Sequence, residues 1–138
     1  EMAFEKVAVD DFDALAIPGG FEEAGFYEDA FDERFLHLIR EFDKQKKPIA
    51  AVCVAALPIG KAGVLTGRKA TTYDLTDGLR HRQLKKFGAE VCNERIVIDQ
   101  NIITSTGPAT GTDVALKLLE MLTGKQNVEM VRKHMRFE

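Results

Sequence analysis

Short apolar runs that end on turn residues alternate along this chain with stretches of helical periodicity. Residues 12–17 form the first run, and Pro18-Gly19-Gly20 ends it, which predicts a buried strand followed by a tight turn. Residues 29–46 then carry apolar side chains at helical spacing, and a second strand is predicted from Pro48 to Cys53. A helix follows this strand to about residue 63. Strand, helix, strand, helix is the pattern of a mostly parallel α/β fold.

The rest of the chain extends the pattern. Residues 68–73 are expected to form a strand, and residues 77–87 a mainly polar helix that ends at Gly88. The apolar runs 95–99 and 101–105 stand too close together for a crossover helix, so they are expected to pair as a hairpin or a staggered pair. Two closing helices are predicted, one ending at Gly124 and one over residues 126–136.

Cys53 stands where the second strand turns directly into a helix of small residues. Such a corner presents its central side chain outside the sheet and directs the first N–H groups of the helix at whatever that side chain attacks. The positive end of the helix dipole favours thiolate, which predicts a lowered pKa for Cys53. The alternative is a buried, unreactive thiol, because free cysteine is among the most buried residue types. For Cys92, in a short apolar run, the structural interpretation is the preferred one.

Composition narrows the classes of function. The 138 residues are 45% hydrophobic and 30% charged, enough for one core, so residues 1–138 are expected to form a single domain. A net charge of -3 offers no broad positive field, which argues against a nucleic-acid partner. Two cysteines fit no disulfide framework or CxxC site, and no apolar run is long enough to span a bilayer. A cytoplasmic protein with no membrane partner, metal or cofactor is therefore expected.

Four segments in register resemble the ThiJ/PfpI superfamily. They are Leu15 to Gly20, a strand ending in Pro-Gly-Gly; Ala51 to Ala55, a nucleophile elbow; Ala62 to Thr72; and Ile103 to Thr110. The resemblance covers nearly the whole chain. It implies a flavodoxin-like three-layer α/β sandwich with a mostly parallel sheet, a homodimer, and the cysteine at the carboxyl edge of the sheet. Family members usually begin with one more strand and helix, so the N-terminal βα unit is expected to be missing from these residues.

The resemblance also implies a site. Cys53 is the expected nucleophile, and the backbone N–H groups of Gly20 and Val54 are the expected oxyanion donors. The possible pocket residues are Gly19, Tyr73, Asp74, Thr106, Gly107 and Pro108. The implied substrates are small electrophilic carbonyl compounds, handled by glyoxalase III, deglycase or related amidase and hydrolase chemistry.

Two departures weaken the catalytic interpretation. The family's cysteine-bonded glutamate belongs to the absent N-terminal segment, and neither Glu22 nor Glu23 is assigned its role. Tyr73 stands where many relatives carry a histidine, and a phenol with an ordinary pKa of about 10 is no base near neutral pH. His81 is the histidine nearest to Tyr73 in sequence, whereas His37 and His134 are expected to be remote or structural. A non-catalytic oxidative-stress sensor or chaperone, in which Cys53 oxidises, and an inert structural domain are the alternatives.

Overall fold

The computed structural model describes residues 1–75 and 77–137. Its central sheet has the order β1-β2-β6-β5, with β1 at Leu15–Ile17, β2 at Ile49–Ala51, β6 at Ile102–Ser105 and β5 at Ile96–Asp99. β1 is parallel to β2 and β2 to β6, whereas β5 and β6 form the expected antiparallel hairpin. A second, parallel pair joins β3 (Lys69–Ala70) to β4 (Glu90–Val91).

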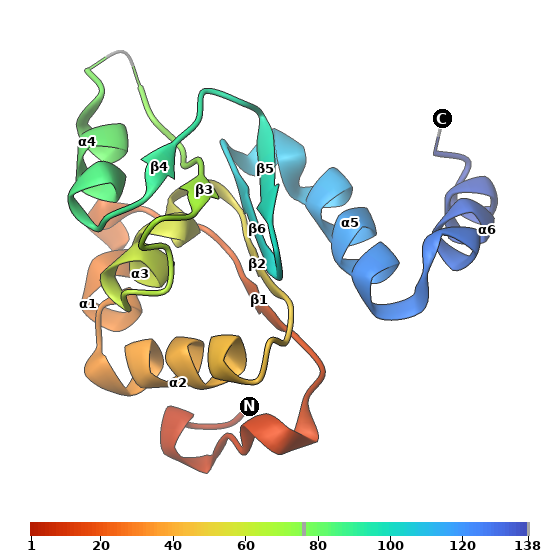
Figure 1. Ribbon diagram of the computed structural model, residues 1–138, viewed down its shortest axis with the longest axis horizontal. Coiled ribbons are helices and arrows are strands. Elements are labelled where there is room, and N and C mark those ends of the chain that lie inside the picture. Colours follow the sequence, from red (N-terminus) through yellow and green to blue (C-terminus); the bar gives the residue numbers. More distant parts are fainter. Residues whose placement is uncertain (76, 138) are drawn as a thin grey trace.

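Helices cover both faces of the central sheet, as Figure 1 shows. On one face α2 (Glu33–Lys44) and α3 (Ala56–Lys61) pack on Ile17, Ile49 and Ile102. On the other face α5 (Gly111–Thr123) packs through Val114 on Ala50 and Ile103. Because successive side chains of a strand point to opposite faces, β1 and β2 are apolar throughout. The expected three-layer, mostly parallel sandwich is confirmed.

The remaining helices lie around this core. α1 spans Phe26–Ala30, α4 spans Leu79–Lys86, and α6 spans Lys125–Met135 and lies farthest from the sheet (Figure 1). Short 3₁₀ turns occupy Phe4–Lys6, Val9–Asp11, Glu22–Ala24, Cys53–Ala55 and Pro108–Thr110. Among the described residues no helix is long and apolar enough to cross a membrane.

Two expected elements differ from the structure. The single helix expected over residues 29–46 is two helices, because Asp32 adopts an extended conformation and its side chain caps α2 by accepting a hydrogen bond from the Arg34 N–H. The strand expected over 68–73 pairs with β4 only at Lys69–Ala70. Beyond it the chain is tied elsewhere, since the Thr71 N–H donates to the Thr104 Oγ1 and the Tyr73 N–H to the Cys53 carbonyl.

Candidate active site around Cys53

Cys53 lies at the carboxyl end of β2, at the corner where the strand meets the 3₁₀ turn that leads into α3. Its φ is +64°, a left-handed conformation that non-glycine residues rarely adopt and that costs of the order of 1–3 kcal/mol. Three hydrogen bonds hold the corner. Its carbonyl accepts from the Tyr73 N–H at 3.3 Å and from the Thr72 Oγ1 at 3.2 Å, and the neighbouring Val52 N–H donates to the Ile17 carbonyl. The corner expected at Cys53, where a strand turns directly toward a helix, is therefore present.

The Pro-Gly-Gly turn after β1 packs directly on this corner. A Cβ atom added at Gly19 would lie 2.7 Å from the Cys53 Cβ, 3.1 Å from the Val52 carbonyl oxygen and 3.3 Å from the Cys53 Sγ. Real Cβ atoms essentially never approach carbon that closely, so this position requires glycine for space. Gly20, its neighbour, packs against the ring of Phe26 with no room for a side chain either. The loop thus brings backbone, and no side chain, against the thiol.

The electrostatics of Cys53 differ from the expectation. Burial of the half-exposed thiol raises its pKa above the ordinary value, and the hydrogen bond from the Val54 N–H opposes this effect without cancelling it. The lowered pKa expected from a helix N-terminus is wrong for these residues. The reason is burial, which disfavours the charged thiolate at the corner where the 3₁₀ turn Cys53–Ala55 begins. The Val54 N–H nevertheless donates a hydrogen bond to the Cys53 sulfur.

Tyr73 and Gly107 lie side by side next to the corner, and Asp74 points away from them. Tyr73 contacts the Gly107 position, where an added Cβ would lie 3.6 Å from its ring. Asp74 is turned toward α4: its carboxylate accepts from the Arg80 N–H at 3.2 Å and lies 3.3 Å from the His81 Nδ1. The Asp74 side chain is only 7% exposed, and the His81 Nε2 is buried without a hydrogen-bond partner. His81 therefore belongs to an Asp74–His81 pair next to the site, and no contact of its ring with Cys53 is found among the described residues.

The structure turns Thr106, one of the other predicted pocket residues, toward β5 and leaves Pro108 exposed. Thr106 faces β5, because its N–H and its Oγ1 both donate to the Arg95 carbonyl. Pro108 is exposed at the start of its 3₁₀ turn. Below this turn the Ser105 Oγ donates to the Ala51 carbonyl and the Thr110 Oγ1 to the Ser105 Oγ, which fixes the turn against the end of β2.

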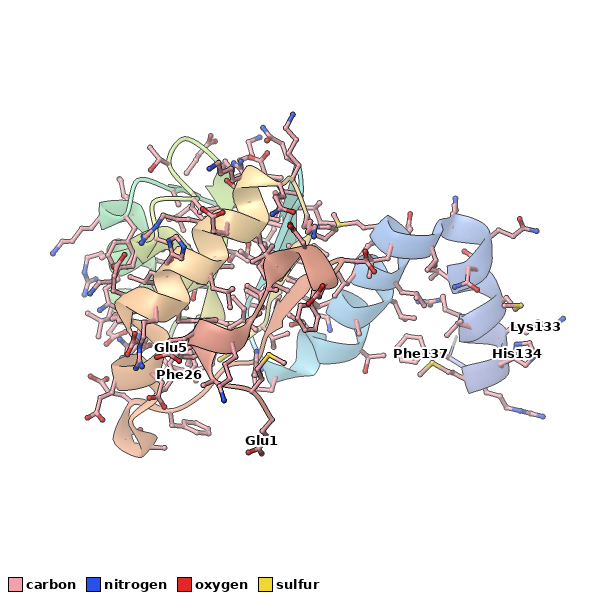
Figure 2. The ribbon with its side chains drawn as sticks, turned by 90° about the horizontal axis from the view of Figure 1, so that it is seen from below. Glu1, Glu5, Phe26, Lys133, His134 and Phe137 are labelled. Atoms are coloured by element: carbon pink, nitrogen blue, oxygen red, sulfur yellow. The ribbon has the colours of Figure 1, made fainter. Side chains whose placement is uncertain are left out.

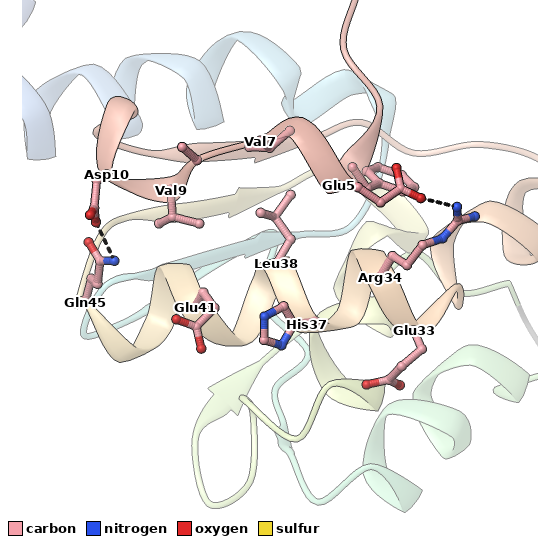
Figure 3. Close-up of a pocket in the computed structure, with 12 residues that line it drawn as sticks. Glu5, Val7, Val9, Asp10, Glu33, Arg34, His37, Leu38, Glu41 and Gln45 are labelled. Atoms are coloured by element: carbon pink, nitrogen blue, oxygen red, sulfur yellow. Dashed lines mark hydrogen bonds and ion pairs between the residues drawn. The ribbon is translucent and has the colours of Figure 1, made fainter.

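The two other histidines lie away from the corner. His134 sits on α6, at the opposite end of the molecule from Phe26, as Figure 2 shows, and its Nδ1 contacts the Met130 carbonyl. His37 is exposed on α2 and lines a groove of about 640 Å³ between that helix and the N-terminal turns, which Figure 3 shows with Glu33 and Glu41 one turn away. The groove holds no cysteine, and within residues 1–75 and 77–137 no side-chain cluster is suited to bind a metal ion.

Three residues that meet around the turn after β1 were not expected from the sequence. Tyr27 on α1, Arg80 on α4 and Glu22 in the turn after β1 form a polar cluster, in which the Arg80 Nη2 lies 2.7 Å from the Glu22 Oε2. The Arg80 guanidinium stacks 4.9 Å from the centre of the Tyr27 ring. Burial raises the pKa of Tyr27; the Arg80 charge lowers it, and Glu22 and Cys53 both raise it. The only signal in the sequence was the Glu22-Glu23 pair behind the two glycines.

Residues 1–121 match the family model described as the DJ-1/PfpI family. The chain belongs to this family. Protein dj-1beta of Drosophila melanogaster is 34% identical over 135 residues, which cover 96% of this chain and 68% of that protein. The crystal structure of Drosophila melanogaster DJ-1beta matches with a TM-score of 0.83 at 31% identity, over 99% of this chain and 70% of that one. The family and the fold expected from the sequence are thus confirmed.

Enzymes are among the similar proteins. The isonitrile hydratase of Pseudomonas putida is 33% identical over 91% of this chain and 52% of its own length. Deglycase PH1704 of Pyrococcus horikoshii is 31% identical over 79% of this chain and 61% of its own length. The chain therefore spans only about half to two thirds of these curated relatives.

Proposed function

We propose that Cys53 is a nucleophile that acts on small electrophilic carbonyl compounds, in glyoxalase III or deglycase-like chemistry. The observation that carries the proposal is the left-handed backbone of Cys53 at the end of β2, with Gly19 packed against its Sγ. A strained conformation at a thiol, held by three hydrogen bonds, is the kind of feature that clusters at active sites. Relatives that carry the name deglycase support the same class of substrate.

In the proposed reaction the Cys53 sulfur adds to the carbonyl carbon. A C–S bond forms, the π electron pair of the carbonyl moves to oxygen, and the thiol proton ends on that oxygen to give a hemithioacetal. The Val54 N–H, which already faces the sulfur, is the proposed donor to the developing oxyanion, and Gly20 is the second. Related hydrolase or amidase chemistry would use the same nucleophile on an acyl carbon, where the C–S bond forms as the bond to the leaving group breaks.

Loss of methylglyoxal in the presence of pure protein tests this proposal. We expect loss to continue beyond one equivalent in the wild type and to fall roughly 100-fold or more in Cys53→Ser. Cys92→Ser is the matched control, because this thiol lies after β4 and its Sγ contacts the Glu90 carbonyl at 3.6 Å. Loss that stops at one equivalent would contradict catalysis.

An oxidative-stress sensor or chaperone is the second candidate, favoured by Tyr73 at the place of the family's histidine, since oxidation needs no base. It predicts that peroxide adds two oxygens to Cys53 before any reach Cys92, which intact mass and peptide mapping would measure. We also propose that residues 1–138 act as one domain of a cytoplasmic homodimer, without a nucleic-acid or membrane partner and without a cofactor.

A further inference from the structure

Arg80 bridges two elements at the rim of the Cys53 site. It starts on the first turn of α4 and reaches the turn after β1, where its Nη2 lies 2.7 Å from Glu22. Its Nη1 donates to the Gln83 Oε1 at 2.9 Å, and its guanidinium stacks on the Tyr27 ring. These three contacts hold the cation in one orientation, and its side chain is only 17% exposed.

Both contact partners of Arg80, Glu22 and Tyr27, belong to the segment that continues from the glycine turn beside Cys53. Glu22 is three residues after Gly19, where an added Cβ atom would lie 2.7 Å from the Cys53 Cβ and 3.3 Å from its Sγ. Tyr27 adjoins Phe26, whose ring packs on Gly20, the proposed oxyanion donor. The Tyr27 pKa responds to Arg80, to Glu22 and to Cys53, which agrees with a common neighbourhood for the guanidinium and the thiol. Glu22 and Tyr27 thus connect the Arg80 guanidinium to the loop that packs against Cys53.

The two partners of this ion pair differ in accessibility. The Glu22 carboxylate is 65% exposed at the end of a flexible side chain, whereas the guanidinium is mostly buried and orientated. An ion pair with an exposed partner is weak, so another carboxylate can displace it. A planar guanidinium with several N–H donors matches a carboxylate in two-point geometry.

We infer that Arg80 determines specificity at this site by binding the carboxylate of a small 2-oxo acid, such as glyoxylate, at the position that Glu22 takes in the free protein. The inference rests on the proposed function of Cys53. The step is the same addition: the C–S bond forms at the aldehyde carbon, the C=O π pair moves onto the carbonyl oxygen, and the thiol proton ends on that oxygen as the new hydroxyl group. The carboxylate keeps all its bonds, so no oxidant or reductant is needed.

The first test compares glyoxylate with neutral methylglyoxal at Cys53, by the rate of adduct formation in intact mass spectra. Arg80→Gln should lower the glyoxylate-to-methylglyoxal rate ratio roughly 10- to 100-fold, as loss of a charge-assisted hydrogen bond predicts. Glu22→Gln, which removes the competing anion from an exposed position, should raise the same ratio. The matched control is Arg34→Gln, an exposed arginine on α2 that pairs with Glu5 and Asp32. An unchanged ratio in both site variants would overturn the inference.

The second test needs no carbonyl chemistry at all. Oxamate, a carboxylate without an aldehyde, should slow iodoacetamide alkylation of Cys53 in the wild type and in Arg34→Gln, and lose most of this effect in Arg80→Gln. Protection without any carbonyl adduct would sustain the role of Arg80 and refute the proposed function. Carbonyl adducts with no oxamate protection and no change in the rate ratio would sustain the nucleophile and refute the role of Arg80.

Discussion

Burial raises the pKa of the Cys53 thiol, whereas the hydrogen bond from the Val54 N–H lowers it, and burial has the larger effect. Because its pKa is raised, the thiolate fraction is small at neutral pH and grows through the alkaline range. We therefore expect the iodoacetamide rate at Cys53 to keep rising with pH beyond the ordinary thiol pKa of about 8.5. The measurement is a pH series on Cys92→Ser, so that Cys53 is the sole thiol. A plateau near pH 7 would show instead an activated thiolate.

Gly19 is required because a side chain at this position has no room, and not because of its backbone angle. In Gly19→Ala the new methyl group would meet the Cys53 Cβ and the Val52 carbonyl, so the elbow or the loop must shift. We expect a loss of about 1–3 kcal/mol in the free energy of unfolding and a changed alkylation rate at Cys53. Urea denaturation and alkylation kinetics measure the two effects.

Gly111→Ala is the control for that substitution. This glycine opens α5 with helical backbone angles and has nothing within 4 Å of an added Cβ. Its replacement should leave alkylation unchanged and alter the free energy of unfolding by no more than about 1 kcal/mol. Equal behaviour of the two alanine variants would mean that the close packing of Gly19 on Cys53 has no energetic consequence.

The position of Cys53 could be predicted from the sequence, whereas the contacts of Arg80 could not. The corner at Cys53 follows from a strand that turns directly into a helix, and Gly19 and Val54 were expected from the resemblance to the ThiJ/PfpI superfamily. Arg80 lies 27 positions after the thiol, on a helix with no apolar stripe strong enough to orient it. Its stacking on Tyr27 and its bond to Glu22 depend on how α4 packs against α1 and the turn after β1. No sequence spacing encodes that packing.

At the scale of elements, the break between α1 and α2 depends on one carboxylate. Asp32 accepts hydrogen bonds from the Arg34 backbone and side chain, and these hold its pKa at about 2. A carboxyl whose pKa is depressed on folding stabilises the fold above its ordinary pKa and loses that contribution as pH falls through the folded value. We expect melting temperatures measured between about pH 5 and about pH 2 to fall less steeply in Asp32→Asn than in the wild type.

The same experiment has an internal comparison. The amide side chain of Asp32→Asn would retain a capping oxygen. At about pH 5 its melting temperature should therefore be lowered only by the lost charge. Asp32→Ala also loses the cap, so its melting temperature should be lower still. Parallel curves for wild type and Asp32→Asn across this range would contradict the assignment of the acid-sensitive bond to Asp32. The sequence alone predicted one continuous helix here, because the apolar spacing of Phe31 and Phe35 runs on through the cap.

At the scale of the molecule, apolar surface gathers outside the core. The exposed large apolar side chains of α5, α6 and the residues just after α6 are Met121, Leu122, Met130, Met135 and Phe137. β1 is the edge strand of the sheet, and its Ala16 is exposed on the face where α5 covers Ala50. Exposed apolar side chains on two neighbouring helices are typical of an interaction surface.

We accordingly predict self-association that depends on this surface. Sedimentation equilibrium should give a dimer in the micromolar range for the wild type, and Leu122→Lys should shift the equilibrium toward monomer by roughly tenfold. Lys117→Ala, a change at an exposed polar position of the same helix, is the control. A wild type that stays monomeric at all concentrations would refute the predicted homodimer.

Sequence alone determined the order of strands and helices, the α/β class and the identity of the corner cysteine, because periodicity, turn residues and a strand-to-helix junction are local properties of the chain. Tertiary structure alone decided three things. It buried the Cys53 thiol enough to raise its pKa, turned Asp74 and His81 toward each other, and set Arg80 over Tyr27 beside the site. Burial and charge pairing depend on which surfaces meet, and residues far apart in the chain meet only when the sheet and its helices close around them.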